Sequence, residues 1–197
     1  MAEQHVQFLM SKRLYLRPVE IEDLDRYYRW MNDRAVTRTL LRHTPLPRGA
    51  EEAWIRACTM ERPSTDFVFA VVLAETREHI GTVGLHEINW IDRTGTTGWF
   101  IGEKEHWGKG YATEAVLLML HYAFTGLNLR KITSQTIASN IASNRVHEKC
   151  GYRECGRSHA QVFRDGQYVD ELLFELFAEE FAAVWERHAP RALQTPA

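Results

Sequence analysis

The feature that most constrains the fold is the segment 112–124, ATEAVLLMLHYAF, which is almost entirely apolar. Its apolar residues include positions 112, 115, 116, 119, 122 and 123, which is the spacing of one face of an α-helix. Leu117, Leu118 and Leu120 widen this stripe until little of the helix surface remains polar. We therefore expect a helix that other elements enclose almost completely.

The segments around this helix follow an order that is typical of a mixed α/β fold. Strands are expected at 12–19, 66–74, 79–91, 94–102, 130–137, 153–163 and 167–177, and further helices at 20–33, 45–62, 143–150 and 178–188. The early strands follow one another through short turns and are expected to be antiparallel, whereas the apolar helix acts as a crossover. The Asp165–Gly166 pair predicts a hairpin between the last two strands.

Composition limits the classes of function. With 197 residues, 45% of them hydrophobic, we expect one domain over 1–197, with a core at about 12–186 and a flexible tail at 188–197. The net charge is -2 and basic residues are scattered among acidic ones, which indicates no nucleic-acid partner. No apolar run approaches the roughly 20 residues of a membrane span, so no membrane partner is expected. The N-terminus lacks a signal-peptide pattern and there are three cysteines, which favours a cytoplasmic protein.

A glycine-containing loop stands between the expected strand at 94–102 and the apolar helix. Its residues are Trp107, Gly108, Lys109, Gly110, Tyr111, Ala112 and Thr113. A loop at a helix N-terminus points backbone N–H groups outward at the positive end of the helix, which suits a phosphate or pyrophosphate. Glycine is needed there because a side chain would block close approach and because such turns often have positive φ.

Two other phosphate-binding patterns do not fit this loop. A Walker A loop needs G-x-x-x-x-G-K-[ST], but five residues separate Gly102 from Gly108, and Gly110 follows the lysine. A dinucleotide fingerprint needs G-x-G-x-x-G, and Thr113 replaces its third glycine. Both classes of nucleotide site are therefore disfavoured.

The loop resembles the acetyl-coenzyme A (acetyl-CoA) loop of the GNAT superfamily of N-acetyltransferases, whose pattern is (Gln/Arg)-x-x-Gly-x-(Gly/Ala). Gly110 and Ala112 match its last two positions, whereas Trp107 stands where Gln or Arg is usual. The longer string WGKGYATEA resembles the subgroup of ribosomal-protein N-terminal acetyltransferases. A second string, NIASNRVHEKCGY at 140–152, resembles the family motif that follows the crossover helix and the next strand.

The resemblance implies a single-domain fold with a mixed, mostly antiparallel sheet of six to seven strands and four to five flanking helices. Its two parallel central strands splay apart, and the acyl arm of acetyl-CoA enters the gap. By the same resemblance, Phe100, Ile101 and Gly102 pair their backbone with the pantetheine arm. Residues 107–113 hold the pyrophosphate, and Asn140 bonds a pantetheine amide.

Acetyl transfer to an amine needs a neutral amine, a stabilised oxyanion and a proton for the leaving thiolate. The resemblance suggests Ser143 as the thiolate's partner, with His147 as the alternative one turn further along the same helix face. Glu87 is the candidate base, since it is expected to share a face with Leu85 and to point into a pocket, and Glu103 is the alternative. Trp99, Tyr27, Tyr28 and Tyr168 are candidates to line the acceptor pocket.

The sequence therefore predicts an N-acetyltransferase that uses acetyl-CoA as cosubstrate and a primary amine as acceptor. The ribosomal-type motifs favour a protein N-terminal α-amine. The alternatives are a small amine, such as a polyamine or an aminoglycoside, and a CoA-binding protein without turnover. No metal site is expected, because His147, Cys150 and Cys155 lack a fourth ligand at a suitable spacing. A homodimer through the last hairpin is a hypothesis.

Overall fold

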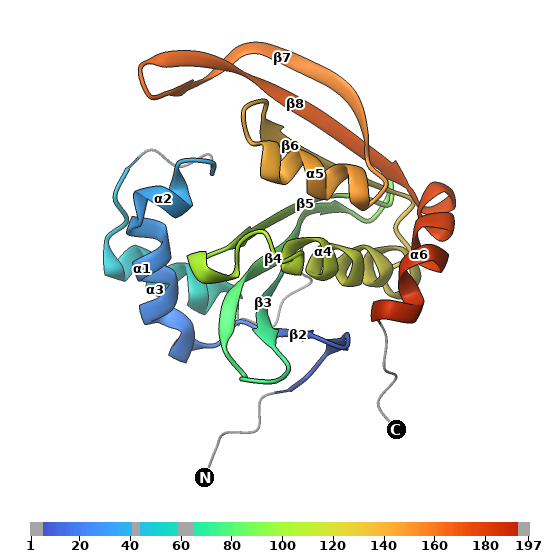
Figure 1. The fold of residues 1–197 in the computed structure, drawn as a ribbon, viewed down its shortest axis with the longest axis horizontal. Coiled ribbons are helices and arrows are strands. Elements are labelled where there is room, and N and C mark those ends of the chain that lie inside the picture. The colour runs from blue at the N-terminus through green and yellow to red at the C-terminus, as the bar shows by residue number, and fades with distance from the viewer. Residues whose placement is uncertain (1–5, 41–43, 59–64, 193–197) are drawn as a thin grey trace.

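One eight-stranded sheet runs through the protein in the order β1-β2-β3-β4-β5-β6-β8-β7 (Figure 1). The structure, a computed structural model, describes residues 6–40, 44–58 and 65–192. The strands are β1 (Leu9–Met10), β2 (Leu14–Pro18), β3 (Phe67–Leu73), β4 (His79–Asn89), β5 (Thr94–Ile101), β6 (Lys131–Ile137), β7 (Arg153–Arg164) and β8 (Gln167–Phe177). Neighbouring strands are antiparallel except β5 and β6, which are parallel. The expected mixed, mostly antiparallel sheet is confirmed.

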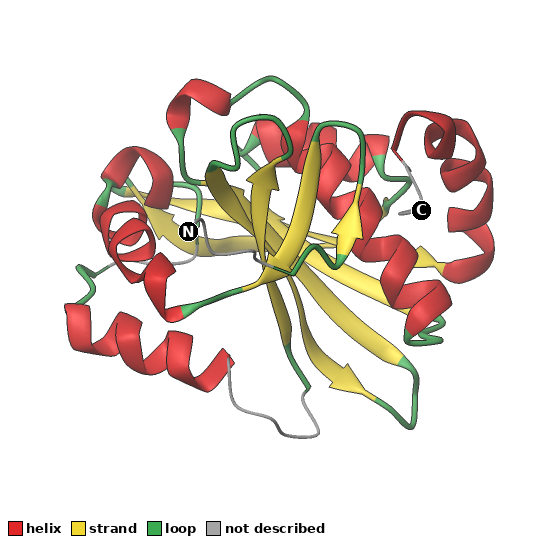
Figure 2. Cartoon of the chain, turned by 90° about the horizontal axis from the view of Figure 1, so that it is seen from below, coloured by secondary structure: helices red, strands yellow, loops and turns green. Residues whose placement is uncertain are grey.

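Helices cover both faces of this sheet (Figure 2). They are α1 (Leu24–Asn32), α2 (Arg34–Thr37), α3 (Arg48–Cys58), α4 (Tyr111–His121), α5 (Ile141–Lys149) and α6 (Ala178–Ala192). Short 3-10 turns lie at Ile21–Asp23 and Lys104–His106, and α4 continues into a π-helical turn at Tyr122–Gly126. None of the helices in the described ranges is long and apolar enough to cross a membrane.

The structure adds three details to the expected elements. The two-residue strand β1 raises the sheet to eight strands rather than six or seven, and it is too short to show an alternating pattern. The four-residue α2 was also not expected, which brings the described α-helices to six. The last helix continues to Ala192 rather than ending where a flexible tail was expected to begin at 188, and residues 193–197 lie outside the described part.

Helix α4 is enclosed as its sequence predicts. Each of the residues from Ala115 to Leu120 is at most 3% exposed. They belong to the largest hydrophobic cluster, together with residues of β2, β3, β4, β6, β8, α5 and α6. Because the sheet supplies one wall of this enclosure, the start of α4 is fixed beside the end of β5.

Alternate residues of β4 face two different layers. Val83 and Leu85 are fully buried in the cluster around α4. Thr82 and Gly84 face the opposite side, where they line a pocket together with residues of α1 and α3. Helices α1 to α3 therefore form a separate layer, whose own cluster includes Tyr27, Trp30 and Ile55.

The parallel strands β5 and β6 separate after a short pairing. Their register covers only Thr94 to Thr96 of β5 against Lys131 to Thr133 of β6. Both strands continue beyond this point, β5 to Ile101 and β6 to Ile137, with their outer edges paired to β4 and β8. The expected splayed central pair is therefore present, and it leaves unpaired backbone along the two inner edges.

Candidate active site

The loop at 107–113 has the backbone conformation that its glycines predict. Gly108 has φ of 72° and Gly110 has φ of 84°, and Gly110 is the left-handed N-cap of α4. Within the described residues, no group accepts a hydrogen bond from the backbone N–H groups of 108–113, whereas the N–H of Glu114 bonds the carbonyl of Gly110. Unbonded N–H groups at a helix N-terminus are suited to donating hydrogen bonds to phosphate oxygens, and pyrophosphate binding by this loop stays a prediction.

Side chains from outside the loop hold both of its ends. The indole Nε1 of Trp107 donates to the carbonyl oxygen of Ile101 at 2.8 Å, which closes the segment between β5 and the loop. At the other end, Arg13 donates from Nη1 to the carbonyl of Lys109 at 3.0 Å and forms an ion pair with Glu114. Trp107 therefore has a structural contact in place of the ligand contact expected of Gln or Arg.

Polar side chains bridge β5 and β6 where their pairing ends. Ser134 donates from Oγ to the carbonyl oxygen of Thr97 at 3.0 Å, and the Thr97 hydroxyl lies 2.5 Å from the hydroxyl of Tyr152. Beyond Thr97 the gap has no recorded bridge among the described residues. The opening therefore begins at Gly98, and Phe100 and Ile101 follow on the same strand. The pairing of Phe100, Ile101 and Gly102 with the pantetheine arm stays a prediction, and the N–H of Gly102 already donates to the carbonyl oxygen of Ile80 at 2.8 Å.

His147 lies behind this opening and is completely buried. Its ring stacks on Phe174 at 4.0 Å and lies 4.7 Å from the ring of Trp99. Nδ1 is 2.9 Å from the carbonyl oxygen of Ser143, which can only accept, so Nδ1 carries the proton of the neutral ring. Nε2 is then an acceptor 2.9 Å from Oγ of Ser134, whose single hydroxyl proton it shares with the carbonyl oxygen of Thr97. Burial lowers the pKa of His147 to about 4, so the ring is neutral at pH 7.

This arrangement favours Ser143 over His147 as the thiolate's partner. The proton of His147 is held by a backbone carbonyl, and the ring reaches no solvent. Ser143 is half-buried, and its hydroxyl has no recorded partner among the described residues. The N-cap of α5 is Asn140, whose Oδ1 accepts from the N–H of Ser143 at 3.1 Å. The amide of Asn140 therefore has one oxygen engaged and its NH₂ group left for a ligand, and its pantetheine contact stays a prediction.

The two candidate bases do not reach a pocket. Glu87 was expected to share the inner face with Leu85, but a bulge between His86 and Asn89 places it at φ of 52° on the exposed surface. The expectation that Glu87 faces the pocket is therefore wrong, because the bulge shifts the alternation of the strand. Glu103 is buried but forms ion pairs with Arg29 and Arg26, so its carboxylate is already engaged.

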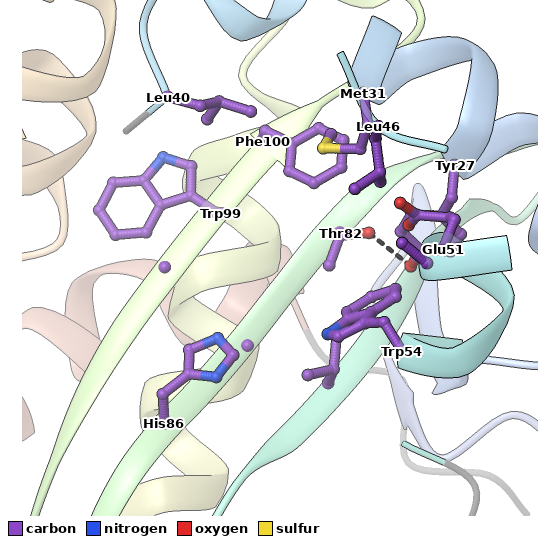
Figure 3. Close-up of a pocket in the computed structure, with 14 residues that line it drawn as sticks. Tyr27, Met31, Leu40, Leu46, Glu51, Trp54, Thr82, His86, Trp99 and Phe100 are labelled. Atoms are coloured by element: carbon purple, nitrogen blue, oxygen red, sulfur yellow. Dashed lines mark hydrogen bonds between the residues drawn. The ribbon is translucent and has the colours of Figure 1, made fainter. Parts of the chain in front are cut away.

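A pocket of about 280 Å³ lies beside the end of β5, on the face covered by α1 and α3 (Figure 3). Its wall is mostly aromatic and aliphatic: Tyr27, Met31, Leu40, Leu46, Trp54, Val68, Trp99 and Phe100. Gly84 and Gly98, which are paired across β4 and β5, lie in the pocket floor, and the ring of His86 packs over Gly84. The polar groups in the wall are Glu51, Thr82 and His86.

Two of the expected pocket residues are present and two are not. Tyr27 and Trp99 line the pocket, whereas Tyr28 and Tyr168 are exposed elsewhere. A carboxylate that is not among the candidates from the sequence, Glu51, also lines the pocket and is only 3% exposed. Glu51 lies four residues before the buried Ile55 on α3, and residues at this spacing share one face of a helix. This spacing is the sequence pattern from which the inward position of Glu51 could have been predicted.

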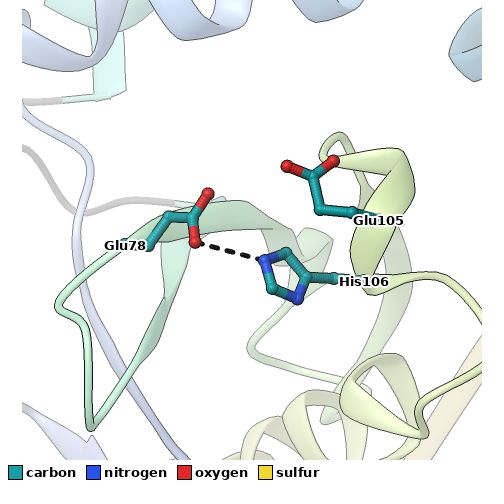
Figure 4. Close-up of side chains that lie close together, drawn as sticks. All are labelled: Glu78, Glu105 and His106. Atoms are coloured by element: carbon teal, nitrogen blue, oxygen red, sulfur yellow. Dashed lines mark hydrogen bonds and ion pairs between the residues drawn. The ribbon is translucent and has the colours of Figure 1, made fainter.

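One further group of side chains could offer metal ligands within the described ranges (Figure 4). Glu78, Glu105 and His106 have ligand atoms within 4.8 Å of one another. Nε2 of His106 already lies 3.1 Å from the carboxylate of Glu78. The Glu78–His106 pair joins the turn between β3 and β4 to the segment that precedes the 107–113 loop. We therefore assign these side chains a structural role.

These features define a class of protein. Backbone N–H groups for a pyrophosphate, an opened pair of parallel strands for an extended arm, and an adjoining pocket for an acceptor together describe an acyltransferase that uses a CoA thioester. The residues fit that cosubstrate, because the described loop leaves its N–H groups free and the gap leaves strand edges unpaired.

Comparison with known proteins identifies the family. The Acetyltransferase (GNAT) domain matches residues 13–153, and the chain belongs to this family. It is 29% identical over 181 residues to "Uncharacterized N-acetyltransferase p20" of Bacillus licheniformis, covering 90% of this chain and 99% of that one. It is 38% identical over 91 residues, 46% of this chain and 52% of the other, to a spermidine N(1)-acetyltransferase of Vibrio cholerae. The crystal structure of spermidine N-acetyltransferase from Vibrio cholerae in complex with CoA and spermine matches with a TM-score of 0.79 and 28% identity, covering 86% of this chain and 98% of that one. The protein is an N-acetyltransferase that uses acetyl-CoA.

Proposed function

We propose that the acceptor is an α-amine next to a bulky apolar group, as at the N-terminus of a peptide. The observation that carries this proposal is the apolar pocket beside Phe100 at the end of β5. A volume of about 280 Å³ suits an amino-acid side chain better than a large ring system. The ribosomal-type loop motif supports the same class of acceptor.

The charges around the pocket also suit an α-amine. A free α-amine has a pKa near 8, so a substantial fraction is neutral at pH 7 to 8, whereas an alkyl amine with a pKa of about 10.4 asks more of a base. Among the described residues that line the pocket, Glu51 is the one carboxylate. In the proposed reaction Glu51 takes the proton that the amine nitrogen loses as its bond to the acetyl carbon forms. The carbon–sulfur bond breaks, and Ser143 gives its hydroxyl proton to the thiolate and regains one from solvent.

A polyamine is the second candidate. The similarity to spermidine N-acetyltransferases supports it, and Glu51 with the surrounding aromatic rings could hold an alkylammonium group. The two candidates differ in the group attached to the amine, which is apolar in one case and cationic in the other.

The test is a panel of acceptors assayed by CoA release and mass spectrometry. We expect acetylation of a peptide that begins with Met or Phe at a kcat/KM well above that of spermidine. Glu51→Gln should lower kcat by about a hundredfold, the usual contribution of a positioned base, without changing the Kd for acetyl-CoA. Glu52→Gln, at the next position of α3, is the matched control and should retain the activity of the parent protein. Acetylation of spermidine but of no peptide would replace the first candidate with the second.

A further inference from the structure

A second cleft adjoins the acceptor pocket. It has a volume of about 420 Å³ and lies between the α1–α2 region and the turn of the β7–β8 hairpin. Its lining residues are Met31, Asn32, Arg34, Thr37, Arg38, Thr44, Pro45, Phe163, Arg164 and Asp165. Figure 1 shows the hairpin reaching over the sheet toward α2, so the cleft joins segments that are distant in sequence.

The cleft carries an excess of positive charge. Arg34 and Arg38 are one helical turn apart and exposed, and within the described residues neither forms an ion pair. The nearby carboxylate of Asp33 is already engaged by Lys104 at 2.7 Å. Arg164 adds a third guanidinium, and Asp165 is the acidic residue in the lining. Exposed arginines in a concave site favour anionic ligands with two oxygens.

The cleft and the acceptor pocket adjoin each other at Met31 and Leu40. Met31 lines both of them. The side chain of Leu40 lines the acceptor pocket, and its carbonyl oxygen accepts a hydrogen bond from Arg164 of the cleft. A ligand that fills the pocket and extends past Met31 and Leu40 therefore enters the arginine-lined cleft.

We propose that the cleft formed by Arg34, Arg38 and Arg164 binds carboxylate groups of the acceptor. Resting on the proposed function, this makes the acceptor an acidic peptide: its first residue occupies the apolar pocket, and the acidic side chains that follow contact the arginines. A polyamine would instead place an ammonium group against this excess positive charge, which weakens its binding. Specificity thus comes from attraction to one class of acceptor and repulsion of another.

The test compares two peptides that differ only in charge, Met-Asp-Asp-Ala-Leu and Met-Asn-Asn-Ala-Leu. The full-length protein should acetylate the acidic peptide with a kcat/KM roughly tenfold higher, because two charge contacts at a partly exposed site are each worth about 1 kcal/mol or less. In the double variant Arg34→Gln, Arg38→Gln this ratio should fall to about one. Arg187→Gln, which removes an exposed charge on α6 outside the cleft, should leave the ratio unchanged.

A binding measurement separates this inference from the proposed function. Calorimetry with the N-acetylated forms of both peptides, in the presence of CoA, reports the cleft without any turnover. A preference for the acidic product in the parent protein, lost in the double variant, supports the cleft even if no peptide is acetylated, in which case only the proposed function fails. Turnover of both peptides with equal kcat/KM, or a preference that persists in the double variant, overturns the assignment of the cleft.

Discussion

The loop proposed to bind acetyl-CoA and the pocket proposed to receive the acceptor adjoin the same strand, β5, but one is a backbone site and the other is a side-chain site. The loop offers unbonded backbone N–H groups, and the side chain of Trp107 holds its shape. The pocket is built from side chains of α1, α3, β3, β4 and β5 and of the segment between the helices. A backbone site depends on glycine positions and stays the same when the surrounding side chains change. A side-chain site can change its ligand through one substitution.

The largest expected effect tests the backbone character of the loop. Gly110→Val puts a β-branched residue at φ of 84° and adds atoms where phosphate oxygens approach, so the Kd for acetyl-CoA should rise by about a hundredfold, or roughly 2.7 kcal/mol. Gly166→Val is the matched control, because Gly166 has φ of 83° in the hairpin turn, with no atom within 4 Å of an added Cβ. Calorimetry should show full affinity in the control, and equal Kd values in both variants would contradict a backbone site.

His147 stands at the boundary between the two regions, and its effect is on stability. Its pKa is lowered to about 4 by burial, so the unfolded chain binds the proton more tightly between pH 6.5 and 4. The contribution of His147 to the free energy of unfolding is therefore highest above pH 6.5, where the ring is neutral in both states. It decreases as the pH falls through this window, and the loss is about 2 kcal/mol at pH 5.

Urea unfolding at pH 7 and pH 5 measures this effect. His147→Phe should lose about 2 kcal/mol less than the parent protein over this interval, since the other titrating groups are shared by both. An identical loss in the two proteins would show that the ring of His147 is protonated in the folded state at pH 5, which contradicts a lowered pKa.

The next effect tests the side-chain character of the pocket. Gly98→Val adds a side chain to the pocket floor, where an added Cβ meets only the ring of His86, at 4.0 Å. The KM for the amine should rise by about tenfold, while the Kd for acetyl-CoA should not change. If both constants shift together, the pocket and the gap are not separate sites.

The smallest effect concerns the indole contact at the end of β5. Trp107→Phe keeps the aromatic ring but loses the Nε1 hydrogen bond to Ile101, a contact worth about 1 kcal/mol. The Kd for acetyl-CoA should rise by about fivefold without a change in the KM for the amine. An unchanged Kd would mean that the loop keeps its shape without this bond.

The same contrast explains what the sequence could and could not predict. The positive φ of Gly110, the enclosed α4 and the N-terminal region of α5 follow from short patterns within one segment. The bulge that turns Glu87 away from the pocket has no glycine or proline to mark it, and it reverses which residue faces inward. Glu51 could have been found from its spacing to Ile55, but its place beside β4 depends on how α3 packs.

The contacts of Trp107 and Arg13 with the two ends of the loop have a consequence for the rate at which the cosubstrate binds. The chain itself fixes the loop, so little conformational entropy remains to be lost on association. Acetyl-CoA should therefore associate in a single kinetic phase, with an observed rate that rises linearly with its concentration, because no slow ordering of the loop precedes or follows the encounter.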